Sequence, residues 1–101
     1  MKNLTLVVNA SVHQAVTDLL RALGVVGFTV SHVEGHGAGS AKDSFLSARD
    51  RVVGFVPRVR VDIVLPPEQL TTVLDALCKP GSGLAGHGTF WISPVERIGQ
   101  F

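Results

Sequence analysis

Apolar and polar positions recur along the chain with two different periods, and each period predicts its own kind of element. The first apolar run, Leu4 to Val8, ends at Asn9 and predicts a strand. A helix is expected next, with Ser11 as its N-cap, Gln14 at the capping-box position and Gly24 just past its end. The apolar face of this helix recurs at helical spacing and consists of Val12, Val16, Leu19, Leu20 and Leu23.

After Gly24 the pattern changes back to strand character. A second strand is expected to start near Gly27 and to include Phe28, Val30 and Val33. From about residue 38 to 54 the periodicity is lost among small and charged residues, which predicts a long loop of the kind that is usually functional or disordered. The clearest strand follows, with alternation that assigns one face to Val59, Val61, Ile63 and Leu65 and the other to Arg58, Arg60, Asp62 and Val64.

The last third of the chain repeats the helix and strand pattern. Pro66-Pro67 opens a second helix with the inner face Leu70, Val73, Leu74 and Leu77, and Lys79-Pro80-Gly81 ends it. A fourth strand is expected from Thr89 to about Val95. This order predicts a single α+β domain over residues 1–101 with the ferredoxin-like βαββαβ arrangement, a four-stranded antiparallel sheet with both helices on one face.

The other face of the expected sheet would be uncovered within one chain. It carries Arg58, Arg60 and Asp62 together with either Trp91 or Phe90. Hydrophobic residues make up 46% of the chain and charged residues only 17%, so part of the apolar surface is expected to be covered by neighbouring subunits.

Composition also limits the kinds of partner. The net charge of +1 gives no electrostatic case for duplex nucleic acid. The single cysteine fits a reducing compartment, and no apolar run reaches membrane-spanning length. Because the first residues lack the pattern of a secretory signal, the protein is expected to be cytoplasmic.

Two glycine-rich loops each contain a Gly-His-Gly triplet and each adjoins an expected strand end: Gly35-His36-Gly37-Ala38-Gly39-Ser40 and Gly81-Ser82-Gly83-Leu84-Ala85-Gly86-His87-Gly88, which leads into Thr89. A loop of this kind presents backbone N–H groups, which suit an anion or a phosphate. The alternative is an ordinary turn that needs positive φ. We expect the two loops to form one ligand site.

Several segments, in order and with matching spacing, resemble the PII signal-transduction family: Gly27-Phe28-Thr29-Val30, Glu34-Gly35-His36-Gly37, Val56-Pro57-Arg58-Val59-Arg60-Val61-Asp62-Ile63-Val64 and Gly86-His87-Gly88-Thr89-Phe90. The resemblance implies a homotrimer of ferredoxin-like subunits with adenine-nucleotide sites in the clefts between neighbours. It also implies that the segment from Ala38 to Gly54 is the T-loop, which contacts a target protein. Gly86 to Thr89 would be the phosphate-binding B-loop, and Thr29 and Val64 would lie by the adenine. The nucleotide is then expected to be held by Gly35 to Ser40 of one subunit and Gly86 to Thr89 of its neighbour.

The nucleotide residues expected from the loops and the resemblance together are Gly27, Phe28, Thr29, Gly35, His36, Gly37, Ala38, Gly39, Ser40, Val64, Gly86, His87, Gly88, Thr89 and Arg97. Arg58 and Arg60 are candidates for bicarbonate or another anion, since an arginine can meet either with two parallel hydrogen bonds. Two loop histidines without converging acidic or thiol ligands predict no metal site.

Departures from the family pattern narrow the expected ligand. Gly39 stands where the nitrogen-regulatory branch carries a glutamine that helps bind a metal and 2-oxoglutarate, and the chain has no tyrosine for nucleotidylation. Thr89 replaces the lysine expected after the second loop, which should weaken ATP more than AMP or ADP. The first loop is more similar to PII-like proteins associated with bicarbonate transport and carboxysomes, so this branch is favoured.

Three alternatives remain. One is a nitrogen-regulatory PII sensor. A second is an RNA-binding ferredoxin-like domain, which the adjacent Phe90 and Trp91 disfavour because neighbouring strand residues face opposite ways. The third is an enzyme, which is disfavoured because no nucleophile with a base and no paired carboxylates stand in a recognisable motif.

Overall fold

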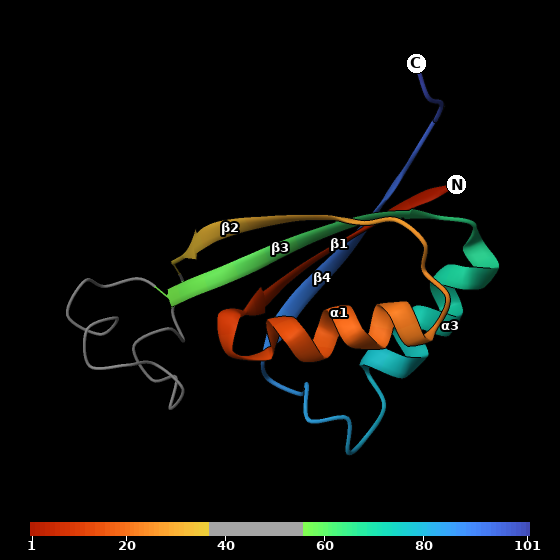
Figure 1. The fold of residues 1–101 in the computed structure, drawn as a ribbon. Coiled ribbons are helices and arrows are strands. Elements are labelled where there is room, and N and C mark those ends of the chain that lie inside the picture. Colours follow the sequence, from red (N-terminus) through yellow and green to blue (C-terminus); the bar gives the residue numbers. More distant parts are fainter. Residues whose placement is uncertain (37–55) are drawn as a thin grey trace.

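The computed structural model describes residues 1–36 and 56–101, in which four strands form one sheet with two α-helices packed on it. Figure 1 shows α1 and α3 together on one face, with the other face open. The elements in chain order are β1 (Lys2–Asn9), the short 3-10 helix η1 (Ala10–Val12), α1 (His13–Ala22), β2 (Thr29–Gly35), β3 (Val56–Leu65), α3 (Pro67–Leu77) and β4 (Gly88–Pro94). The sheet order is β2-β3-β1-β4 with every neighbouring pair antiparallel, which confirms the predicted ferredoxin-like fold.

The core lies between the helices and the two central strands. Alternate residues of β1 and β3 point toward the helices, because successive side chains of a strand face opposite sides. The buried residues of this layer are Leu4, Leu6, Val8, Val59, Val61, Ile63 and Leu65 from the strands and Val16, Leu20, Leu70 and Val73 from the helices. The sequence pattern therefore assigned the inner face of β3 correctly, whereas Leu19 of α1 is half-buried outside this core.

The two ends of α1 differ in how well the sequence predicted them. Gly24 has φ +79°, and its N–H donates to the Arg21 carbonyl at 3.0 Å, as expected for a glycine that ends a helix. The predicted capping box is wrong, because Ser11 lies inside η1 and Val12 occupies the N-cap position. Gln14 instead donates from Nε2 to Asp18 Oδ1 at 2.8 Å, one turn further along the helix.

The predicted second strand begins two residues too early. The first β2 pair joins Thr29 to Asp62 of β3, so Gly27 and Phe28 belong to the connection that returns from α1 to the sheet. Phe28 packs against the core, and the Arg21 guanidinium lies 5.7 Å from its ring centroid. These contacts hold Phe28 beside α1, outside the hydrogen-bonded pairing of β2 with β3.

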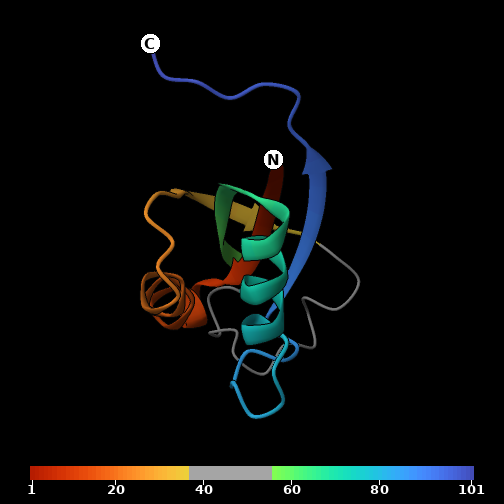
Figure 2. The ribbon, with the colours of Figure 1, turned by 90° about the vertical axis from the view of Figure 1, so that its right-hand side faces the viewer.

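The edge strand β4 exposes apolar side chains on both of its faces. The register pairs Trp91 with Thr5 and Phe90 with Leu6, so Trp91 belongs to the open face and Phe90 to the helix side. This assignment resolves the alternative left by the sequence. Phe90, Trp91 and Ile92 are 45%, 44% and 42% exposed, and Figure 2 shows the chain after β4 leading away from the sheet.

Candidate functional site

The glycine loop between α3 and β4 uses its glycines for two different physical reasons. Gly81, Gly83 and Gly86 have φ values of +83°, +82° and +79°, a conformation that other residues rarely adopt. Gly88 is needed for space instead, because a Cβ there would lie 2.8 Å from Val8 Cγ1. The loop is therefore both a series of tight turns and a close approach of backbone to β1.

Four residues from four elements meet where this loop reaches the sheet, and we call them the loop-end cluster: Asn9, Gly35, Arg58 and His87. The Asn9 N–H donates to the His87 carbonyl at 2.8 Å, and Asn9 Nδ2 lies 3.4 Å from His87 Nδ1. Arg58 Nη1 donates to Asn9 Oδ1. The cluster thus joins the second glycine loop to the ends of β1 and β3.

Gly35 completes the loop-end cluster through shape. A Cβ at Gly35 would fall on the side chain of Arg58, within 2.8 Å of Cγ and 2.6 Å of Cδ. Any larger residue at position 35 would require the arginine to move away from the end of β2. Gly35 and His87, one residue from each of the two predicted loops, are therefore linked within one chain through Arg58 and Asn9, whereas the sequence analysis expected the two loops to come from neighbouring subunits.

A second polar group, the paired-end cluster, lies further along the open face and consists of Thr5, Arg60, Asp62 and Trp91. Arg60 Nε donates to Asp62 Oδ2 at 2.9 Å and Nη2 donates to Oδ1 at 3.2 Å. Thr5, which is fully buried, donates to Asp62 Oδ1 at 2.8 Å. The guanidinium of Arg60 also lies 5.7 Å from the Trp91 ring centroid.

Charge separates the two clusters. The hydrogen bond from Arg60 lowers the pKa of the Asp62 carboxyl, and the bond from Thr5 acts in the same direction against the opposing effect of burial. The same contact raises the pKa of Arg60. Within residues 1–36 and 56–101 no carboxylate pairs with Arg58, which is held by a neutral amide. Both arginines are charged, but the charge of Arg60 is offset by Asp62, whereas no described carboxylate offsets the charge of Arg58.

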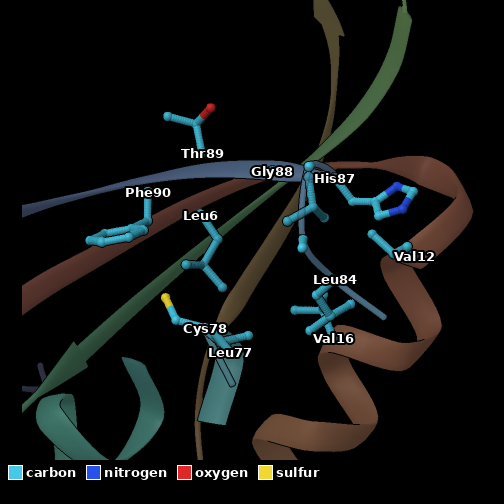
Figure 3. Close-up of a pocket in the computed structure, with 13 residues that line it drawn as sticks. Leu6, Val12, Val16, Leu77, Cys78, Leu84, His87, Gly88, Thr89 and Phe90 are labelled. Atoms are coloured by element: carbon cyan, nitrogen blue, oxygen red, sulfur yellow. The ribbon is translucent and has the colours of Figure 1, made fainter. Parts of the chain in front are cut away.

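The helix side of the glycine loop borders a mainly apolar pocket of about 310 Å³. Figure 3 shows Leu6, Phe90, Leu77 and Leu84 around it, with Cys78 among them, while Thr89 points away. Apolar walls suit an apolar group rather than a phosphate. The loop-end cluster, on the open side of the sheet, has the chemistry that an anion requires.

Other predicted site residues lie at the opposite end of the sheet from the loop-end cluster. Thr29 pairs with Asp62, and Val64 pairs with Asn3 near the start of β1. Arg97 is exposed and follows Val95, whose N–H donates to the Met1 carbonyl at 3.3 Å. Gly27 and Phe28 precede β2 at the same end. One chain therefore contains two separate groups of expected nucleotide residues.

Part of the expected site lies outside the described residues, namely Gly37, Ala38, Gly39, Ser40 and the rest of the predicted loop. His36 is described, and its Nε2 lies 3.3 Å from Glu34 Oε2. In the described part of the chain no three His, Cys, Asp or Glu residues are grouped so that they could hold a metal ion. No described helix is long and apolar enough to cross a membrane.

Sequence reasoning treated Asn9 only as the end of a strand, although it is the residue that joins the loop-end cluster. It is 3% exposed, and its partners are 49 and 78 residues away in the sequence. An asparagine after an apolar run carries no local signal of burial or of distant partners. The apolar pocket was missed for a similar reason, because residues from α1, α3, β1 and β4 line it.

The fold places the chain in the class of small ferredoxin-like α+β domains, and comparison with known proteins identifies its family. The family model described as "Nitrogen regulatory protein P-II" matches residues 1–101, so the chain belongs to the P-II family of regulatory proteins. It is similar to nitrogen regulatory protein GlnK of Escherichia coli K12, with 26% identity over 99 residues that cover 97% of this chain and 88% of that protein. Nitrogen regulatory protein P-II 1 of the same organism is 25% identical over the same shares.

Proposed function

We propose that this protein is a cytoplasmic, homotrimeric signalling protein that binds an adenine nucleotide in the clefts between subunits. AMP and ADP are the favoured ligands and ATP is weaker. The nucleotide state would change how the segment from about 38 to 54 binds a target protein, so the proposed role is regulatory rather than catalytic. Membership of the P-II family supports the class of function.

The separation of the expected nucleotide residues within one chain carries the proposal. Gly35, His87 and Gly88 lie at one end of the sheet, whereas Thr29, Val64 and Arg97 lie at the other. A single site that uses both groups requires two copies of the chain. The half-exposed Phe90, Trp91 and Ile92 of β4 supply apolar surface for such an association.

Within this cleft, Arg58 is the proposed contact for the phosphate or for an accompanying anion. Its guanidinium is held by the Asn9 amide beside the glycine loop, and its charge is not offset by a carboxylate of the described chain. Arg60 is a weaker candidate because Asp62 already accepts two of its hydrogen bonds. Thr89 points away from the apolar pocket and would face the same ligand from the open side of the loop.

The first experiment is calorimetric titration of the purified protein with AMP, ADP and ATP. Each titration is run with and without bicarbonate, and light scattering measures the oligomeric state in parallel. We expect a trimer with micromolar binding of AMP or ADP and weaker binding of ATP. Absence of binding to all three nucleotides would refute the proposed ligand class.

A mixing experiment tests whether the site lies between subunits. Arg58→Met and Thr29→Ala damage opposite ends of the sheet, so trimers of either variant alone have no intact cleft. In trimers reassembled from an equal mixture, about a quarter of the clefts combine two undamaged halves. Recovery of tight sites in the mixture supports the shared cleft, and no recovery contradicts it.

The second ligand distinguishes two regulatory roles. Gly39 in place of the glutamine expected for a nitrogen sensor favours bicarbonate and a target in inorganic-carbon metabolism. The similarity to GlnK and P-II 1, whose names describe nitrogen regulation, favours the alternative of a nitrogen-regulatory sensor. Titrating bicarbonate and 2-oxoglutarate separately into the nucleotide-bound protein decides between them, because only the true effector should tighten nucleotide binding.

A further inference from the structure

We propose that Asn9 is a positioning residue: held by Arg58, it determines which ring nitrogen of neutral His87, in the second glycine loop, carries the hydrogen. The side-chain amide of Asn9 has two chemically different ends, and each end contacts a different residue. Oδ1 accepts a hydrogen bond from Arg58 Nη1, and Nδ2 lies 3.4 Å from His87 Nδ1. The inference extends the proposed function, but its central test needs no ligand.

Arg58 fixes the orientation of the amide. A guanidinium can only donate hydrogen bonds, so the amide atom that faces it must be the carbonyl oxygen. The other end, which faces His87, is therefore the NH₂ group. An amide that was turned by 180° would place two sets of N–H donors against each other, which the arginine prevents.

The amide orientation in turn selects one tautomer of the neutral His87 ring. Because Asn9 Nδ2 donates, His87 Nδ1 must accept and carry no hydrogen. The proton then resides on Nε2, which becomes a donor in the glycine loop. The Asn9 N–H also donates to the His87 carbonyl at 2.8 Å, and this bond holds the backbone of His87 beside Asn9.

Gly35 extends the same linkage to the end of β2. The arginine side chain occupies the space that a Cβ at Gly35 would need, with its Cδ 2.6 Å from that position. A displacement of Arg58 therefore changes both the packing against Gly35 and the bond to Asn9. Asn9, which is 3% exposed, thus joins His87 of the second glycine loop to Arg58, the side chain that packs against Gly35.

The decisive measurement is the nitrogen chemical shift of the His87 ring in ligand-free protein, which distinguishes the two tautomers. The wild type is expected to show the Nε2–H form. In Asn9→Asp a carboxylate, which only accepts hydrogen bonds, replaces the amide, so the Nδ1–H form should become dominant. In Arg58→Met the amide is no longer held in one orientation, and an appreciable fraction of Nδ1–H should appear.

Asn3→Asp is the matched control, because it makes the same change on the same strand, and Asn3 Nδ2 donates to Thr5 Oγ1 rather than to the cluster. It should leave the His87 tautomer unchanged. The proposal is overturned if Asn9→Asp keeps the Nε2–H form, or if Arg58→Met leaves the tautomer as in the wild type. Backbone amide spectra and the unfolding transition identify any variant that fails to fold, and the remaining variant then decides.

A second readout connects the linkage to the ligand. Asn9→Asp places a negative charge beside Arg58, so the affinity for AMP should fall by about tenfold while Asn3→Asp stays within about twofold of the wild type. Equal affinities of the two variants would contradict the role of Asn9 at the site. If the wild type binds no nucleotide, the proposed function fails, and the tautomer measurement still decides the inference.

Discussion

The two polar clusters of the open face use the same residue type for different purposes. Arg58 and Arg60 are two positions apart on β3 and face the same way, yet Arg60 is paired with Asp62 and Arg58 with the neutral Asn9. In the paired-end cluster the charges of Arg60 and Asp62 offset each other. In the loop-end cluster Arg58 is linked through Asn9 to His87 of the glycine loop, and no carboxylate among the described residues offsets its charge.

This difference indicates which of the two arginines is available to bind an anion. An arginine already bonded twice to a carboxylate must lose those bonds before it can bind an anion. An arginine held by a neutral amide has no opposite charge beside it, and it loses only a weaker hydrogen bond when it binds an anion. Substitutions in the two clusters test this difference between the two arginines, in order of decreasing expected effect.

The largest effect is expected from adding a methyl group at Gly35. Gly35→Ala forces Arg58 away from the end of β2 and from Asn9, and the loss of a hydrogen bond from a charged donor costs about 1.5 kcal/mol of unfolding free energy. Urea denaturation at fixed protein concentration measures the loss. The matched control is Gly27→Ala, because a Cβ at Gly27 would meet no atom within 4 Å among the described residues. Equal stabilities of the two variants would show that Arg58 can leave Gly35 without cost.

The next effect compares the two arginines directly. Arg58→Met should weaken AMP binding by about tenfold, because a charge-assisted contact to phosphate contributes about 1.5–3 kcal/mol. Arg60→Met should change the affinity by less than about twofold, since its charge is already offset. Methionine retains much of the arginine stem in both cases. Calorimetry on the two variants settles the comparison, and a larger loss for Arg60→Met would reverse it.

The sequence predicted the elements well where a single strand or helix decides the outcome. Alternation on β3 separated Val59, Val61 and Ile63 from Arg58 and Arg60, because the period of a strand fixes its faces. The failure at Ser11 has a local cause: the chain leaves β1 through a 3-10 turn, which the capping-box pattern does not encode. The correct assignment of β3 and the wrong capping box at Ser11 both depend only on residues that are close together in the sequence.

The candidate site was less predictable because its contacts are long-range. The glycine motifs indicated that Gly35 and His87 belong to one site, but they did not indicate the chain of contacts that links the two residues or what occupies the space beside Gly35. That space is occupied by the side chain of Arg58, 23 residues further along, and its partner Asn9 belongs to a third strand. Period and propensity describe one element at a time, whereas this cluster depends on how four elements meet.

A substitution in the paired-end cluster should change the stability of the protein and leave its affinity for AMP unchanged. Thr5→Val keeps the side-chain shape and removes the hydroxyl that donates to Asp62 at 2.8 Å. We expect a loss of about 1 kcal/mol in unfolding free energy and no change in AMP affinity. Urea denaturation followed by the fluorescence of Trp91, the only tryptophan, measures the first quantity and calorimetry the second. A weakened affinity for AMP would mean that the hydrogen-bonded Asp62 carboxylate, and not only the neighbouring Thr29, contributes to the site.

The smallest effect is the pH dependence that Asp62 gives to stability. Its pKa is lowered in the folded protein by the bond from Arg60, so its contribution to stability is fully present above the unfolded pKa of about 4. That contribution is lost as the pH falls through the lower, folded value. The stability difference between wild type and Asp62→Asn should therefore be constant from pH 7 to 5 and shrink below pH 4. Asp75→Asn, on an exposed position of α3, is the control. A difference between wild type and Asp62→Asn that is as large at pH 3 as at pH 7 would mean that the carboxylate of Asp62 is not held by Arg60, and the contrast between the two ends of the sheet would lose its electrostatic basis.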